Sequence, residues 1–201
     1  MQINKKQQLQ LLQLARDSIR HGLVNSPGNG PVNGLGSSSG LIPDKSHYDL
    51  TLQQQVACFV TLTLHHNLRG CIGHLEAIQP LYKDVAENAF SAAFKDPRFA
   101  PLSTEEFDLM TIEISVLTPA QAMSFNSEED LLDQIQAGID GLILEDGYQR
   151  GTFLPSVWES LPDKRQFWQH LKLKAGLSAD HWSDSVKVSR YRTLAFSETQ
   201  Q

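Results

Sequence analysis

Cysteines are scarce in this sequence and long apolar runs are missing from it, and both absences exclude classes of protein. The 201 residues contain two cysteines, Cys58 and Cys71, so no disulfide framework is expected and a reducing compartment is indicated. No stretch approaches the run of about 18 apolar residues that crosses a bilayer. The polar N-terminus lacks the apolar segment of a secretory signal. We therefore expect a cytoplasmic protein with no membrane association.

A concentrated basic surface is also missing. Lysine and arginine number 17 against 23 acidic residues, and the net charge is −6. Nucleic-acid binding usually depends on counterion release from a dense basic face, so this charge balance disfavours it. The histidines show no metal-binding spacing, since His65 and His66 are adjacent and no H-x-x-x-H or C-x-x-C pair occurs. No Ser-His-Asp order appears either, and we predict neither a metal nor a cofactor.

Hydrophobic periodicity predicts helices and strands in irregular order. An apolar stripe at every fourth residue predicts a helix over residues 4–22. Residues 25–46, which carry five glycines and three prolines, predict a long mobile loop. Strict alternation predicts strands over 56–64 and 109–118, and the first is followed by a turn and a returning strand at 68–73. This order favours the α+β class over a regular βαβ repeat.

Shorter patterns and capping residues predict the remaining elements. Pro80 suits the start of a helix, because its missing N–H costs nothing there. Ser103 and Glu106 have the spacing of a capping box. The full set is helices at 80–96, 103–106, 127–135 and 167–175, and strands at 142–144, 152–154, 186–191 and 194–196.

The run Leu68-Arg69-Gly70-Cys71-Ile72-Gly73 holds the residues best suited to chemistry. In a strand, Arg69 and Cys71 point to the same side, about 7 Å apart. A cation beside a thiol favours the thiolate, so Cys71 is a candidate nucleophile and Arg69 its activator or an anion clamp. Gly70 and Gly73 leave room for another backbone or a ligand. The alternative is that Cys71 packs in the core, as we expect for Cys58.

Three other residues are candidates. Arg98 has donors that suit a carboxylate or phosphate, and Asp96 can orient it or accept a proton; alternatively the two form a structural pair at a helix end. Glu113 stands between two isoleucines of a strand, where a carboxylate is costly unless it is exposed or paired. It is a candidate acid or base, or an ordinary solvent-facing residue. His74 would act on Cys71 only if the chain turned after Gly73.

Together these segments resemble the AMMECR family, whose prokaryotic members are called AmmeMemoRadiSam system protein A. The resemblance extends from Leu9 to Phe196, apart from the glycine-rich loop. Ser156 stands where the family usually has glutamine, so no role of that amide is carried over. Besides the six-residue run, the matching segments include Leu14-Ala15-Arg16, Phe59-Val60-Thr61-Leu62, Asp96-Pro97-Arg98-Phe99, Glu113-Ile114-Ser115-Val116-Leu117, Thr152-Phe153-Leu154-Pro155 and Lys174-Ala175-Gly176-Leu177.

The resemblance implies a larger α+β domain around an antiparallel-rich mixed sheet flanked by helices, with a smaller second lobe. We therefore divide the chain into an N-terminal helix at 1–24, a loop at 25–46, and the remainder of a single domain with a minor lobe at 47–201. The resemblance also implies that the strand with Cys71 borders a cleft beside the turn at 96–99. It implies a pathway shared with a Memo-like protein and a radical S-adenosylmethionine (SAM) enzyme.

Two functional hypotheses stay open. In the first, the protein is a component of a modification or small-molecule pathway, with Cys71 as nucleophile or redox thiol and Glu113 as acid or base. In the second, it is a non-catalytic binding or scaffold protein that recognises a partner through the same face. The predicted substrate-binding or partner-binding residues are Arg69, Gly70, Gly73, Asp96 and Arg98. The sequence assigns no oligomeric state.

Overall fold

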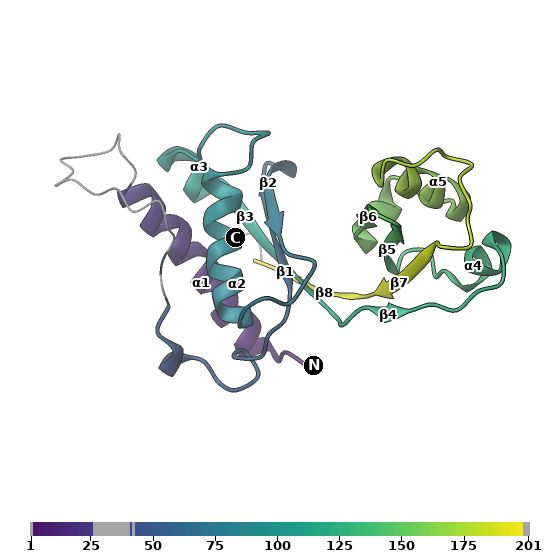
Figure 1. The fold of residues 1–201 in the computed structure, drawn as a ribbon. Helices are drawn as coiled ribbons and strands as arrows, with labels where there is room; N and C mark the ends of the chain where they lie inside the picture. Colours follow the sequence, from purple (N-terminus) through teal and green to yellow (C-terminus); the bar gives the residue numbers. More distant parts are fainter. Residues whose placement is uncertain (1, 26–40, 42, 199–201) are drawn as a thin grey trace. The chain divides into compact units, whose positions relative to one another are not determined.

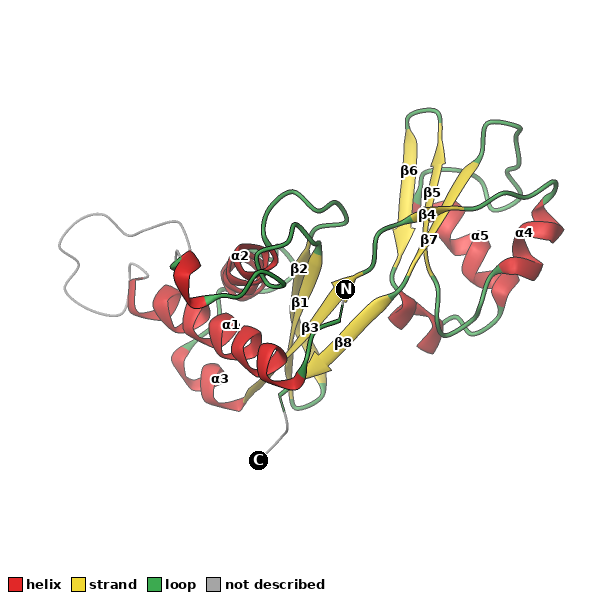
Figure 2. Ribbon diagram, turned by 90° about the horizontal axis from the view of Figure 1, so that it is seen from below, coloured by secondary structure: helices red, strands yellow, loops and turns green. Residues whose placement is uncertain are grey.

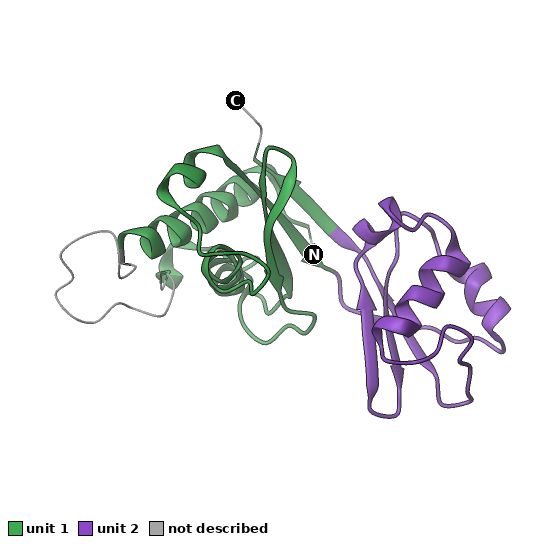
Figure 3. Cartoon of the chain, turned by 90° about the horizontal axis from the view of Figure 1, so that it is seen from above, with its two compact units in different colours: residues 1–117, 194–201 green, residues 118–193 purple. Residues whose placement is uncertain are grey.

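The structure, a computed structural model, describes residues 2–25, 41 and 43–198. Most of the loop predicted at 25–46 therefore lies outside the described residues. No helix among the described residues is long and apolar enough to cross a membrane. The chain divides into two compact units: unit 1 comprises residues 1–117 and 194–201, and unit 2 comprises residues 118–193 (Figure 3).

Unit 1 contains a four-stranded sheet with the strand order β2-β1-β3-β8. Strand β1 is antiparallel to both β2 and β3. The elements in chain order are α1 (Lys5–Asn25), the short 3-10 helix η1 (Lys45–His47), β1 (Cys58–Leu64), β2 (Asn67–Gly73), α2 (Leu81–Phe94), α3 (Thr104–Leu109), β3 (Met110–Leu117) and β8 (Thr193–Ser197) (Figure 1).

Helices α1 and α2 lie on the same side of the β1, β2 and β3 strands (Figure 2). The strand side chains that face them are apolar and buried: Val60 and Leu62 of β1 and Ile112 and Ile114 of β3 are fully buried. They share one core with residues of both helices, among them Leu11, Ile19, Val85 and Ala89. The alternating residues between them are half-buried or exposed. The period-two pattern therefore sorts core residues to one face and polar residues to the other.

A tight hairpin joins β1 to β2, as the sequence predicts. Its turn residues His65 and His66 have φ angles of 51° and 65°. Two-residue hairpin loops favour positive φ because the resulting twist matches that of the strands, and asparagine and glycine usually supply it. The pairing register slips between Leu62 and Thr63, so that Arg69 becomes an extra residue in β2. Such a bulge bends the strand and redirects side chains.

Sequence signals also locate the ends of α2 and α3. Helix α2 begins directly after Pro80 and ends at Phe94, shortly before Asp96 and its following proline. The hydroxyl of Ser103 accepts the N–H of Glu106, and the Glu106 carboxylate accepts the N–H of Ser103. The capping box therefore turns the Glu106 side chain back toward the start of α3.

Unit 2 contains a second four-stranded sheet with the order β4-β7-β5-β6. Its core includes Trp158 and Phe167, whose rings stack with 3.7 Å between centroids. The β5–β6 hairpin turns at Gly147, whose φ of 61° suits glycine. The elements are β4 (Gln121–Ala122), α4 (Glu128–Gln134), β5 (Gly141–Asp146), β6 (Gln149–Phe153), the 3-10 helix η2 (Pro155–Glu159), α5 (Lys164–Lys174) and β7 (Lys187–Tyr191).

The predicted α+β class is confirmed. The strand pairs β1–β2, β1–β3, β4–β7, β5–β6 and β5–β7 are antiparallel. The described strands form two four-stranded sheets, β2-β1-β3-β8 and β4-β7-β5-β6. Sequence periodicity does not predict β4, because two residues are too few to show alternation.

Candidate functional site

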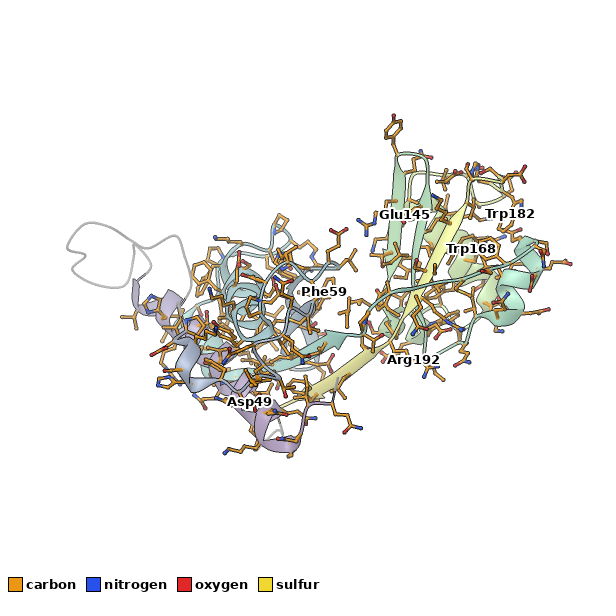
Figure 4. The ribbon with its side chains drawn as sticks, turned by 60° about the horizontal axis from the view of Figure 1, so that its bottom comes forward. Asp49, Phe59, Glu145, Trp168, Trp182 and Arg192 are labelled. Carbon is orange, nitrogen blue, oxygen red and sulfur yellow. The ribbon has the colours of Figure 1, made fainter. Side chains whose placement is uncertain are left out.

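The two glycines of the β2 run lie against the chain's own atoms. A Cβ added to Gly70 would lie 2.1 Å from the backbone oxygen of Ala92 in α2. A Cβ added to Gly73 would lie 2.4 Å from both the backbone oxygen of Cys58 and the ring of Phe59, which Figure 4 labels. The close approach predicted at these positions is therefore made by α2 and β1. Because Gly70 faces the helices, its neighbour Cys71 faces away from them.

Cys71 belongs to a row of three side chains that crosses three strands. Thr61 of β1 pairs with Cys71 of β2 on one side and with Glu113 of β3 on the other. The Thr61 hydroxyl donates a hydrogen bond of 3.2 Å to the Cys71 sulfur. Cys71 and Thr61 are half-buried and Glu113 is exposed. Since adjacent strands lie about 4.8 Å apart, the thiol and the carboxylate arise from positions about 10 Å apart, with Thr61 between them.

Arg69 makes a structural ion pair rather than the predicted pair with Cys71. Its Nε and Nη2 donate to the two carboxylate oxygens of Glu106 at 2.8 and 2.9 Å, and Nη2 also donates to the backbone oxygen of Ala100. This hydrogen-bonded guanidinium lowers the pKa of Glu106. The Nη1 atom is buried without a hydrogen-bond partner among the described residues. In the structure Arg69 therefore joins β2 to α3, and its predicted role as activator of Cys71 or anion clamp stays a prediction.

Asp96 and Arg98 hold the backbone of Cys71 from both sides. The Asp96 carboxylate accepts the N–H of Cys71 at 2.9 Å, and Arg98 Nη2 contacts the Cys71 carbonyl oxygen at 3.3 Å. Arg98 also donates to both carboxylate oxygens of Asp96 at 2.9 and 2.7 Å. These bonds, together with two backbone N–H donors, hold the pKa of Asp96 well below its usual range. A cationic side chain was expected from Arg69; the one that contacts Cys71 is Arg98, through the Cys71 carbonyl oxygen.

The second cysteine lies in a buried polar cluster on the helix side of the sheet. Cys58 is fully buried; its thiol donates to Asp84 at 3.2 Å, and burial raises its pKa well above the ordinary value. Asp84 also contacts the His74 Nδ1 at 2.6 Å. His74 therefore stays on the face opposite Cys71 and is not positioned as its base. Sequence reasoning missed Asp84, because a carboxylate on a helix gives no sign of burial.

The row of Cys71, Thr61 and Glu113 and the turn at residues 96–99 bring several reactive groups together. They supply a thiol, a hydroxyl, a carboxylate and a guanidinium, all in unit 1. Thr61 was absent from the sequence-based candidates because its partner across the sheet depends on register. Within residues 2–25, 41 and 43–198, no three histidine, cysteine, aspartate or glutamate side chains are grouped to hold a metal ion.

The fold and the site define an α+β protein with two small sheets and a half-buried thiol on the outer face of one of them. The sequence profile of the AMMECR1 family matches residues 12–196, and the chain belongs to this family. It is 40% identical over 161 residues to Protein MJ0810 of Methanocaldococcus jannaschii, covering 76% of this chain and 78% of that protein.

Two further comparisons extend over nearly the whole chain. A protein of Thermofilum pendens is 35% identical over 195 residues, which cover 94% of this chain and 88% of that protein. The crystal structure of the uncharacterized protein PH0010 from Pyrococcus horikoshii matches with a TM-score of 0.79 and 33% identity. That match covers 94% of this chain and 89% of the other. The family resemblance inferred from the motifs is confirmed.

Proposed function

We propose that this protein is a component of a modification or small-molecule pathway and that Cys71 is its reactive group. The observation that carries the proposal is the hydrogen bond from Thr61 to the half-buried Cys71 sulfur, in a row that continues to Glu113. A hydroxyl that donates to sulfur stabilises negative charge on that atom. Cys58, fully buried beside Asp84, offers an unreactive comparison in the same protein.

Each group in the row has a role in this proposal. Cys71 acts as the nucleophile or redox thiol, and Glu113 takes or gives a proton at the far side of a small ligand that spans Thr61. Arg98 provides the anion-binding group, since its side chain is 53% exposed whereas Arg69 is buried against Glu106. Guanidinium donors suit a carboxylate or phosphate on that ligand.

The pathway partners follow from the family resemblance. We infer that the protein acts in the cytoplasm with a Memo-like protein and a radical SAM enzyme, and we assign no cofactor to this chain. A reactive thiol is compatible with such a setting, because a reducing compartment keeps cysteines free. Both cysteines are free in the structure.

Alkylation tests the reactivity of Cys71 directly. At neutral pH we expect iodoacetamide to modify Cys71 at least about ten times faster than N-acetylcysteine, because Thr61 donates a hydrogen bond to the reacting sulfur. Cys58 should stay unmodified in the folded protein, since it is fully buried. Mass spectrometry of the two cysteine peptides measures both rates. Thr61→Val should slow the reaction of Cys71 without affecting Cys58.

A deletion strain supplies the functional arm of this test. Cys71→Ala is expected to fail to complement the strain, and Cys58→Ala that retains its fold is expected to succeed. A Cys71 that reacts no faster than the free thiol, together with full complementation by Cys71→Ala, would remove the proposal.

One observation favours a second function, a non-catalytic scaffold that binds a partner. Most polar groups of the motif are engaged within the protein: Arg69 with Glu106, and Asp96 with the Cys71 N–H and with Arg98. The exposed part of Arg98 is then the group available to a partner. Arginine is enriched at the centres of protein interfaces, often in pairs with acidic residues.

Pull-down of the Memo-like protein separates this second function from the first. Arg98→Ala is expected to weaken binding at least tenfold if Arg98 contacts the partner. The matched control is Arg20→Ala, because Arg20 has the same 53% side-chain exposure and also pairs with an aspartate. Equal binding by wild-type protein and both variants would exclude this face as the partner surface.

A further inference from the structure

Unit 1 contains a hollow of about 750 Å³ that has no part in the function proposed above. It lies between the first half of α1, the β1–β2 turn, the end of α3 and the end of β8. Residues that line it include Lys5, Leu9, His65, His66 and Leu109. Its volume falls within the roughly 300–1,000 Å³ typical of small-molecule sites.

Most of the residues that line the hollow are polar, but two exposed leucines lie among them. Leu9 is 57% exposed and Leu109 is 58% exposed, whereas Leu12 and Met110 beneath them are buried. Single exposed leucines are common on protein surfaces, but here two of them line the same concave site. An apolar group that entered the hollow would cover both leucines and remove their side chains from water.

The charged groups around the hollow divide into two sets. Arg16 donates to both carboxylate oxygens of Glu198 at 2.7 and 2.6 Å, and it also attracts Asp108. The side chains of Lys5, His65 and His66, in contrast, form no hydrogen bond or ion pair with any other residue that the structure describes. Arg16 therefore neutralises Glu198, whereas Asp108 keeps its charge at the rim, and the nitrogen donors of Lys5, His65 and His66 are left for a ligand.

The β1–β2 turn adds an independent observation. His65 and His66 occupy left-handed backbone conformations, with φ of 51° and 65°. Asparagine followed by glycine is the usual pair in such a turn, and two successive non-glycine residues with positive φ are uncommon. Strained residues persist at functional sites when their side chains are needed there. Both imidazoles border the hollow, so a ligand in it accounts for their presence in this turn.

We propose that this hollow binds a small amphipathic anion. The apolar part of the ligand lies against Leu9 and Leu109, and its carboxylate or phosphate head accepts hydrogen bonds from Lys5, His65 and His66. Neither an apolar molecule without a charge nor a bare anion makes both sets of contacts. The site is distinct from the row of Cys71, Thr61 and Glu113.

The test uses octanoate and octyl phosphate as probes with the full chain, and amide chemical shifts follow binding. Both probes are expected to shift residues around the hollow and to saturate, while acetate and 1-octanol bind at least ten times more weakly. His65→Asn combined with His66→Gly should weaken octanoate binding at least tenfold. The same double variant should raise the thermal midpoint by about 2–4 °C, because it relieves the turn.

Paired lysine variants provide the control. Lys5→Gln should weaken octanoate binding, and Lys6→Gln should not, since Lys6 is exposed on α1 but does not line the hollow. Loss of binding with a gain in stability is a result that a merely structural turn would not produce. Unchanged octanoate affinity in the double histidine variant, or equal losses in the two lysine variants, would overturn the proposal.

Discussion

Replacement of Gly70 by alanine is expected to destabilise unit 1 by at least about 3 kcal/mol, because the added methyl group overpacks a buried interface. The new Cβ would lie 2.1 Å from the Ala92 carbonyl oxygen and 3.0 Å from its carbonyl carbon. Both are backbone atoms of α2, so no side-chain rotation relieves the clash. Either the helix or the strand must move, and the core between α2 and β1 opens.

The two units allow this effect to be located. All three tryptophans, Trp158, Trp168 and Trp182, lie in unit 2. Figure 4 labels Trp168 and Trp182. Tryptophan fluorescence therefore follows unit 2 in urea, and amide exchange in β1 and β2 follows unit 1. In Gly70→Ala we expect the free energy of amide-exchange protection in β1 and β2 to fall by at least about 3 kcal/mol.

The matched control is Gly138→Ala in unit 2. Gly138 has a φ of 78° and no atom within 4 Å of an added Cβ, so only backbone strain opposes the change. Its expected cost is about 1 kcal/mol. Equal losses of stability of about 1 kcal/mol in Gly70→Ala and Gly138→Ala would show that α2 moves aside at little cost. The close packing of Gly70 would then not determine the stability of unit 1.

The elements that sequence predicts well are those specified by neighbouring residues. The apolar stripe of α1, the alternation in β1 and the capping box at Ser103 each depend on residues a few positions apart. All three are present in the structure. Local patterns succeed here because the period of side-chain direction is a property of the helix or strand itself.

The contacts of the candidate site depend instead on how distant segments meet. Glu106 appears in the sequence as a capping residue, yet it also pairs with Arg69, 37 positions away. Simple alternation along the strand would place Arg69 on the same side as Cys71. In the structure the slip in register beside Leu62 instead makes Arg69 an extra residue of the strand. A single bulge changes the direction of a side chain without leaving a mark in the hydrophobic pattern.

The row of Cys71, Thr61 and Glu113 is a second arrangement that the sequence does not predict. Cys71 and Glu113 are candidates from residue type and position alone, but their relation depends on the central residue, Thr61. Only the register of β1 with β2 and β3 brings the three into line. Turn geometry and core packing set that register, and a single sequence carries no direct record of it.

Asp96→Asn is expected to destabilise unit 1 by about 1.5–3 kcal/mol at neutral pH, the usual range for hydrogen bonds to a charged group. The Asp96 carboxylate accepts hydrogen bonds from the guanidinium of Arg98 and from the backbone N–H groups of Arg98 and Cys71. Asparagine keeps the size and one acceptor oxygen but loses the charge. Amide exchange in β2 measures the change.

The pH dependence identifies the charge as the cause. The pKa of Asp96 is depressed in the folded protein, chiefly by its hydrogen bonds with Arg98. Its stabilisation is therefore complete above the unfolded pKa of about 3.9 and is lost as the pH falls toward the folded value. The stability difference between wild-type protein and Asp96→Asn should be constant from about pH 7 to pH 5 and shrink below about pH 4.

An exposed aspartate supplies the control for this measurement. Asp133 is exposed on α4, and Asp133→Asn removes the same unit of charge. It should change the stability of unit 1 by less than about 0.5 kcal/mol at any pH. A stability difference for Asp96→Asn that persisted undiminished at pH 3 would instead assign the effect to altered shape.

The same substitution connects the stability of the turn to the proposed reactivity. Asp96 accepts the N–H of Cys71, so loss of the Asp96 charge should also change the alkylation rate of Cys71.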